Sequence, residues 1–270
     1  MPLAKPMLHW HRVVEPLAGA IAASPEPALR LGISGAQGSG KSTLTRELVA
    51  ALRRREIPVA ACSLDDFYLT RRERRSLAAN VHPLLATRGV PGTHDVALCQ
   101  RILAELPDKA VRVPHFDKGS DDRVVAGEWS SAGPARVVIL EGWCVGARPQ
   151  SVAALTVPVN ALERDEDPDG RWRRYVNAAL AGAYQRLFDR LDYLVYLAVP
   201  DFEAVARWRG EQELALPQGR RMDTARLERF IAHYERLTRW MLDEVPARAD
   251  MVVRLTAAHG IASLITNRPL

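Results

Sequence analysis

A glycine-rich segment constrains the fold of this chain more than any other feature. It reads Gly35-Ala36-Gln37-Gly38-Ser39-Gly40-Lys41-Ser42-Thr43. The apolar run 28–33 precedes it, and leucines spaced four apart follow it at Leu44, Leu48 and Leu52. A glycine-rich turn from a strand into a helix is the context of a P-loop, in which inward-facing backbone N–H groups and the helix N-terminus bind phosphate. The sequence therefore predicts a nucleoside triphosphate site, and we expect residues 35–43 to form it.

Two side chains of this segment have chemistry of their own. In P-loops, the lysine reaches the β and γ phosphates as a point charge, and the serine hydroxyl binds Mg²⁺. We expect Lys41 and Ser42 to take these roles, with Lys41 also contributing to catalysis. The predicted cofactors are ATP or GTP together with Mg²⁺.

Apolar runs and helical patterns alternate along the rest of the chain. Strands are expected at Ala28–Ile33, Val59–Leu64, Val111–Pro114, Val137–Leu140, Tyr193–Val199 and Met251–Leu255. Helices are expected after the P-loop and at about 96–106, 171–190, 202–214 and 224–245. This alternation indicates the α/β P-loop NTPase fold, with a mostly parallel sheet and helices on both faces. Ligands then bind at the carboxyl ends of the strands.

The bulk composition fits one such domain. Residues 1–27 are rich in proline and predict a short N-terminal helical extension, and residues 28–270 predict a single domain with a helical lid near 201–222. The net charge is +5, but the arginines are scattered, so neither a nucleic acid nor a membrane partner is expected. The chain has no signal peptide pattern or run of eighteen apolar residues, which favours a cytoplasmic protein. Nothing in the sequence predicts the oligomeric state.

Acidic residues stand at two of the predicted strand ends. The second strand is followed by Asp65 and Asp66, and the fourth ends in Glu141. A kinase needs a base for the acceptor hydroxyl, and we assign that role to Asp65. Glu141 is expected to bind Mg²⁺ directly or through water, and Asp65 is a further candidate ligand. An Asp pair that caps the next helix, or an edge acid in a loop, would give the same pattern.

Cationic and polar residues gather in two loops on the expected acceptor side. One loop carries Arg88, His94 and Asp95, although Asp95 is equally suited to cap the following helix. The other follows the third strand. Cations in this region suit an anionic or hydroxyl-rich substrate. The residues predicted to bind substrate are Asp66, Tyr68, Arg88, His94, Asp95, His115, Asp117, Lys118 and Arg123.

Two arginines follow the fifth strand, on the helix predicted for the lid. Arg207 and Arg209 would neutralise charge on the transferred phosphoryl group if this helix folds over the phosphates. An exposed basic helix face is the alternative.

Several sequence blocks together resemble one family. They are GISGAQGSGKST, SLDDFYLT, TRGVPGTHD, PHFDKGSDDR, VVILEGWCVG and VARWRGEQE, and they span residues 28–245. The chain resembles the plant- and fungal-type D-glycerate 3-kinases and their bacterial relatives, within the P-loop kinases that include uridine kinase, pantothenate kinase and phosphoribulokinase. The resemblance implies transfer of the ATP γ-phosphate to D-glycerate, with Asp65 as the base and Arg207 or Arg209 in the lid. The loop from Gly119 to Arg123 is shorter than that of the family, and it lies on the acceptor side.

Two other functions fit the sequence. One is a kinase of the same class whose acceptor is a nucleoside, pantothenate or another polyol. A nucleotide-dependent regulatory or nucleic-acid-binding protein would also use a P-loop, but the chain lacks a concentrated basic stripe, aromatics in series and a guanine-binding N-K-x-D element.

Overall fold

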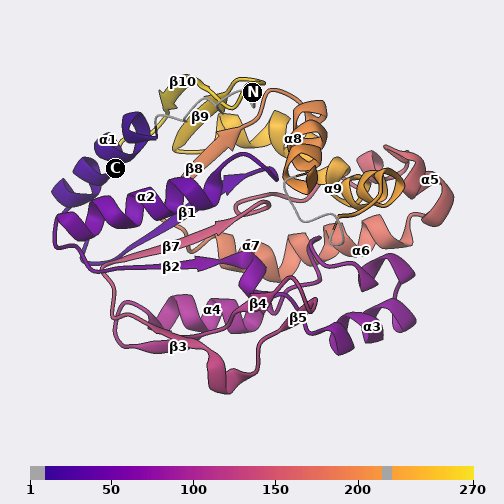
Figure 1. Ribbon diagram of the computed structural model, residues 1–270, viewed down its shortest axis with the longest axis horizontal. Coiled ribbons are helices and arrows are strands. Elements are labelled where there is room, and N and C mark those ends of the chain that lie inside the picture. The colour runs from indigo at the N-terminus through magenta and orange to yellow at the C-terminus, as the bar shows by residue number, and fades with distance from the viewer. Residues whose placement is uncertain (1–9, 215–220) are drawn as a thin grey trace.

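The structure is a computed structural model and describes residues 10–214 and 221–270 (Figure 1). Part of the predicted N-terminal extension (1–9) and part of the predicted lid (215–220) therefore lie outside the described residues. No helix in the described part of the chain is long and apolar enough to cross a membrane.

A twisted sheet runs through the centre of the molecule (Figure 1). Over the described residues it has six strands in the order β10-β9-β8-β1-β7-β2, and every neighbouring pair is parallel except β10 with β9. The strands are β1 (Leu29–Gly35), β2 (Val59–Ser63), β7 (Val137–Gly142), β8 (Tyr193–Ala198), β9 (Met251–Leu255) and β10 (Ile261–Thr266). The predicted mostly parallel α/β sheet is confirmed.

Side chains alternate across this sheet and so build two apolar layers. Leu194 and Tyr196 of β8 face one layer, whereas Val195 and Leu197 face the other. The layer at Val195 is covered by α1 (His11–Ala23), α2 (Lys41–Arg54) and α8 (Phe202–Leu214). The layer at Leu194 is covered by α4 (Val96–Glu105), α7 (Gln185–Phe188) and part of α9 (Thr224–Glu244). Helices on both faces are thus confirmed as well.

All five predicted helices are present. The expected helix 171–190 consists of α6 (Arg171–Ala179), a π-helical turn (Leu180–Tyr184) and α7. Helices α3 (Arg71–Asn80) and α5 (Ala161–Glu166) were not predicted. Short 3₁₀ turns occur at Leu64–Phe67, Pro83–Ala86, Ala126–Glu128, Ala153–Leu155 and Val245–Ala247.

The third predicted strand lies outside the main sheet. Val111–Val113 (β3) pairs antiparallel with Ser130–Ala132 (β6), and β4 (Phe116–Asp117) pairs with β5 (Asp122–Arg123) in a small hairpin. The expectation of a main-sheet strand at 111–114 was wrong, because three apolar-alternating residues do not reveal which sheet they join. The segment that follows β3 is consequently a hairpin beside the sheet.

Helix α1 belongs to the same core as the sheet. Trp10, Val13, Leu17 and Ile21 are buried in the layer that α2 also covers. The described part of residues 1–27 therefore packs on the domain as an integral helix.

Candidate active site

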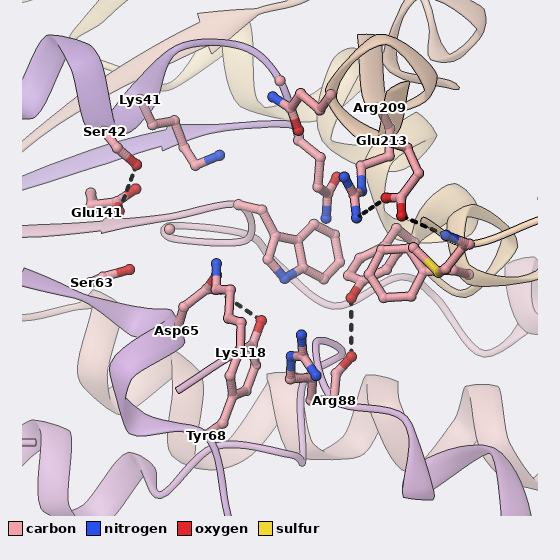
Figure 2. A pocket seen from close by; sticks show the side chains of 18 of the residues that line it. Lys41, Ser42, Ser63, Asp65, Tyr68, Arg88, Lys118, Glu141, Arg209 and Glu213 are labelled. Carbon is pink, nitrogen blue, oxygen red and sulfur yellow. Dashed lines mark hydrogen bonds and ion pairs between the residues drawn. The ribbon is translucent and has the colours of Figure 1, made fainter. Parts of the chain in front are cut away.

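A large cavity opens at the carboxyl ends of the parallel strands. Its volume is about 1180 Å³. The residues predicted from the sequence that line it are Gln37, Gly38, Lys41, Ser42, Asp65, Tyr68, Arg88, Asp117, Lys118, Glu141 and Arg209. Figure 2 shows labelled side chains of this set, among them Lys41, Asp65, Lys118 and Arg209, converging from the start of α2, the segment after β2, the β4–β5 hairpin and α8. The position agrees with the rule that ligands bind outside the carboxyl ends of such strands.

The P-loop joins β1 to α2 and depends on glycine at its tip. Gly38 and Gly40 have φ angles of 81° and 91°, a left-handed backbone that side chains other than glycine rarely adopt. A Cβ on Gly38 would also lie 2.9 Å from Cβ of Trp208, which packs against the loop from α8. The P-loop and α8 are therefore in direct contact.

Lys41 is held within the loop that it serves. Its Nζ donates a hydrogen bond to the Ala36 carbonyl at 3.1 Å. Burial lowers the pKa of Lys41, while the nearby carboxylates Glu141 and Asp65 act in the opposite direction. The ammonium thus lies within electrostatic range of both acids and can reach an anion bound in the loop.

Ser42 and Glu141 form a pair of hard oxygen donors. The Ser42 hydroxyl donates to Oε1 of Glu141 at 3.1 Å. Glu141 pairs in register with Ile33 of β1 and Ser63 of β2, so the central position of β7 brings it beside the P-loop. Mg²⁺ is commonly held by one or two protein oxygens together with substrate phosphates and water, and this pair fits that requirement. Within residues 10–214 and 221–270, no three His, Cys, Asp or Glu side chains cluster as a separate metal site.

Asp65 lies across the cavity from Ser42 and Glu141, at the start of the turn after β2 (Figure 2). Its Oδ1 accepts a hydrogen bond from the Tyr68 hydroxyl at 2.8 Å, and its Oδ2 accepts one from Lys118 Nζ at 2.8 Å. Burial raises the pKa of Asp65, but the Lys118 charge and the two hydrogen bonds outweigh it, so the net pKa is lowered. The carboxylate is therefore ionised at neutral pH.

Asp66 is not among the residues that line the cavity, and it fastens the β4–β5 hairpin. Its Oδ1 accepts from the Phe116 N–H at 3.1 Å and lies 3.0 Å from Nδ1 of His115, whose side chain is mostly exposed. Burial raises the pKa of Asp66, partly offset by these two partners. Asp66 and His115 were both predicted to bind substrate, but neither lines the cavity.

The hairpin tip presents Lys118 to Asp65. Asp117 accepts hydrogen bonds from the N–H groups of Gly119 and Ser120, at 2.8 and 3.1 Å, which stiffens the turn around Lys118. Asp121 then pairs with three arginines: Arg71, Arg74 and Arg88. Arg74 is fully buried and also donates to the carbonyls of Leu69, Ala86 and Asp121.

Arg88 is the cavity-lining member of that arginine group (Figure 2). Its guanidinium is paired with Asp121 and lies over the Phe116 ring, 5.3 Å from the ring centroid. The Arg88 carbonyl accepts from the Tyr234 hydroxyl at 3.0 Å. Backbone and side chain are both held, so the guanidinium has a defined position at the cavity wall.

His94 supports Tyr68 from behind the cavity. Its ring stacks on Tyr68 with centroids 4.5 Å apart, and its Nδ1 lies 2.6 Å from the Tyr184 hydroxyl. Burial lowers the pKa of His94 to about 4, so the ring is neutral at physiological pH. His94 was predicted to bind substrate, whereas in the structure it is buried and outside the cavity lining.

Asp95 and Arg123 also lie behind the cavity wall. Asp95 caps α4 by accepting from the Leu98 N–H at 3.0 Å, which is the alternative the sequence left open. Its second oxygen accepts from Arg123 at 3.2 Å. The two predicted substrate residues thus bind each other.

The two arginines of α8 differ in their surroundings. Arg209 lines the cavity, lies 2.9 Å from the buried carboxylate of Glu213 and stacks over Phe230 at 5.5 Å from the ring centroid. Arg207 is exposed and does not line the cavity. Helical spacing separates them, because Arg209 is four residues from buried Val205 and Arg207 only two.

Aromatic residues form a wall that sequence reasoning missed. Trp143, Phe230 and Tyr234 line the cavity, and Trp143 packs edge-on against Tyr234 at a centroid distance of 5.0 Å. The indole N–H of Trp143 donates to the Gly89 carbonyl at 2.8 Å. Trp143 stands two residues after Glu141, in the turn that follows β7. Phe230 and Tyr234 come from α9, far away in the sequence.

This geometry defines a phosphate-binding loop that faces a carboxylate across a cavity, which is the arrangement of a P-loop kinase. No family model matches the chain. The chain is 36% identical over 244 residues to the uncharacterized kinase mug58 of Schizosaccharomyces pombe, covering 82% of this chain and 85% of that protein. It is 29% identical over 222 residues to the chloroplastic D-glycerate 3-kinase of Arabidopsis thaliana, covering 77% of this chain and 46% of that protein.

A solved structure of a kinase is also similar to this chain. The D-glycerate 3-kinase of Cryptococcus neoformans superposes with a TM-score of 0.75 at 27% identity, over 94% of this chain and 99% of that one. The predicted P-loop fold is thereby confirmed. The chain belongs to the P-loop kinases, and D-glycerate 3-kinases are among its relatives. It is a small-molecule P-loop kinase.

Proposed function

We propose that this kinase transfers the γ-phosphate of ATP to a hydroxyl of D-glycerate, giving 3-phosphoglycerate. The names of two relatives support this acceptor. The cavity supports it through Lys118 and Arg88, two cations that line it together with Asp65 and suit a carboxylate beside the reacting hydroxyl.

One observation carries the proposal above the others. Asp65 faces Lys41, Ser42 and Glu141 across one cavity, so a hydroxyl between them would lie close both to a base and to a γ-phosphate (Figure 2). In-line transfer depends mainly on such positioning and on charge stabilisation.

In the proposed reaction, each residue has a separate role. The acceptor hydroxyl gives its proton to Asp65 while its oxygen forms a bond to the γ-phosphorus. The bond from that phosphorus to the β–γ bridging oxygen breaks, and ADP leaves with the electron pair. Lys41 and the P-loop N–H groups hold the phosphates, and Arg209 balances charge that develops on the transferred group.

The metal site follows from the same residues. Ser42 and Glu141 would hold Mg²⁺, and Asp65 on the facing wall of the cavity is a further candidate for contact through water. The ion supplies charge neutralisation between the β and γ phosphates when it is bound.

A nucleoside acceptor is a second candidate, favoured by the aromatic wall of Trp143, Phe230 and Tyr234. Bases stack on such rings. A panel of acceptors separates the two candidates. D-glycerate, L-glycerate, glycerol, pantothenate and uridine are each incubated with the protein, ATP and Mg²⁺, and ADP is measured. We expect D-glycerate to give the highest kcat/KM. A higher kcat/KM with uridine would show that the acceptor is a nucleoside and not D-glycerate. An equal rate of ADP release without any acceptor would contradict the kinase proposal.

A further inference from the structure

Lys118 stands at the tip of the β4–β5 hairpin and lines the cavity together with Asp65. Its ammonium bonds to the residue assigned as the base, with Nζ 2.8 Å from Oδ2 of Asp65. The other carboxylate oxygen accepts from Tyr68. Both oxygens of Asp65 are therefore engaged, and an acceptor hydroxyl meets a base whose charge is already balanced.

The backbone of Lys118 is fixed, whereas its side chain is free to move. Asp117 closes the turn, Phe116 is tied to Asp66, and Arg74 holds the Asp121 carbonyl. The Lys118 side chain itself is 63% exposed, and Asp65 is the partner it contacts. Lys118 is thus the exposed partner of the pair and Asp65, at 28%, the more buried one, so the ammonium is the group that can exchange its contact for another anion.

Arg88 behaves in the opposite way. Its side chain is 24% exposed and is held both by Asp121 and by the Phe116 ring. A guanidinium has donors to spare after one such pair. Arg88 can thus bind an incoming carboxylate without leaving its place, whereas the exposed Lys118 side chain can turn from Asp65 toward that carboxylate.

We propose that Lys118 masks Asp65 until an acceptor bearing an anionic group draws the ammonium away. This inference rests on the proposed function and names its acceptor class: a hydroxyl compound with a carboxylate close to the reacting hydroxyl. The carboxylate binds Arg88 and Lys118, and the departure of Lys118 frees Oδ2 of Asp65 for the hydroxyl. A neutral polyol cannot compete for Lys118, so Asp65 stays masked, and water meets the same barrier.

Glycerol and D-glycerate form a matched pair for the test, because glycerol replaces the carboxylate by a hydroxymethyl group. In Lys118→Met we expect kcat/KM for D-glycerate to fall about 100-fold, since a charge-assisted contact is lost. The kcat/KM for glycerol should rise about fivefold, because the Lys118 ammonium no longer covers Asp65. Lys118→Arg should keep the preference of the wild type. Lys109→Met, which removes an exposed lysine paired with Glu105, is the control and should change neither value.

Binding provides a readout that does not depend on turnover. D-glycerate affinity is measured by calorimetry for the wild type, Asp65→Asn, Lys118→Met and the double variant. Masking predicts that Asp65→Asn binds D-glycerate about fivefold more tightly, because Lys118 is then free. In the Lys118→Met background the same change should give no gain. A gain that persists in that background would come from simple removal of a like charge and would contradict the masking.

The outcomes separate the inference from the proposed function. If wild-type protein phosphorylates D-glycerate but glycerol turnover in Lys118→Met stays level or falls, Lys118 is only a substrate ligand and the masking is wrong. If wild-type protein phosphorylates none of the acceptors in the panel, the proposed function fails and the masking with it.

Discussion

Trp208 packs directly on the glycine at the tip of the P-loop. A Cβ at Gly38 would lie 2.9 Å from Cβ of Trp208, and the Gly38 backbone is left-handed with a φ of 81°. Helix α8, which also carries Arg209, is thus built against the phosphate-binding loop. A shift of the P-loop on binding phosphate would therefore move α8 through the contact with Trp208.

Gly38→Ala tests this contact. We expect it to lower the free energy of unfolding by about 1–3 kcal/mol, because the new methyl group clashes and the backbone is strained. Urea denaturation measures the change. Gly182→Ala is the matched control, since no atom lies within 4 Å of its Cβ position, and it should leave stability unchanged or slightly raised. Full stability of Gly38→Ala would mean that Trp208 does not press on the loop.

Asp65→Asn tests the base. Removing the proton acceptor should lower kcat by about 10²–10⁴-fold while ATP affinity stays within a few-fold, because the nucleotide is held by the P-loop. Steady-state kinetics and nucleotide titration measure the two quantities. Exposed Asp108, outside the cavity, serves as the control through Asp108→Asn. Retained turnover in Asp65→Asn would remove Asp65 from the mechanism.

Arg209→Ala tests the contribution of α8. We expect kcat to fall about 10–100-fold, since the guanidinium offers charge to the transferred group. Stability should fall as well, because the buried Glu213 carboxylate loses its partner. Arg207→Ala should have a much smaller effect, because that side chain points to solvent. Equal losses in both variants would contradict the assignment of Arg209 over Arg207.

The loop and its facing acids were predictable, and the reason is geometric. Parallel strands end at one edge, so Asp65 and Glu141 had to approach the P-loop once the strand order put β7 between β1 and β2. Sequence reasoning failed where the chain leaves the sheet. Capping of α4 by Asp95 was an alternative that it left open. It did not show that Asp66 pairs with His115 or that Arg123 pairs with Asp95. Nor did it show that His94 packs between Tyr68 and Tyr184.

The aromatic wall was hidden for a different reason. Phe230 and Tyr234 reach the cavity from α9, nearly ninety residues after Trp143, and apolar residues on a helix look the same whether they face a core or a cavity. The choice between Arg207 and Arg209, in contrast, was available from helical spacing. Arg209 lies nearly on the buried face of α8, and Arg207 lies opposite.

His233 makes stability depend on pH. It is buried in α9 with Nδ1 2.8 Å from the Arg229 carbonyl, and burial lowers its pKa from 6.5 to about 4. As the pH falls, His233 therefore takes up a proton in the unfolded chain before it does so in the folded protein. The stability that neutral His233 contributes is complete above the unfolded pKa and is lost as the pH falls toward the folded pKa.

His233→Gln should remove this dependence. Between about pH 7.5 and about pH 5, the wild type should lose about 2 kcal/mol more unfolding free energy than the variant. Urea denaturation at the two pH values measures the difference. His11→Gln, at the exposed start of α1, is the control and should keep the wild-type dependence. A variant with the same dependence as the wild type would show that His233 is not kept neutral by burial.

ADP formation with and without D-glycerate measures phosphoryl transfer to this acceptor. Purified protein is incubated with ATP and Mg²⁺, with and without D-glycerate, and the product is identified by ³¹P NMR. We predict that ADP and 3-phosphoglycerate form together in equal amounts. Without the acceptor, ADP release should be lower by about 100-fold or more, because Lys118 then stays on Asp65 and this base cannot activate water. ADP release at the same rate in both reactions, or no release in either, would contradict the account.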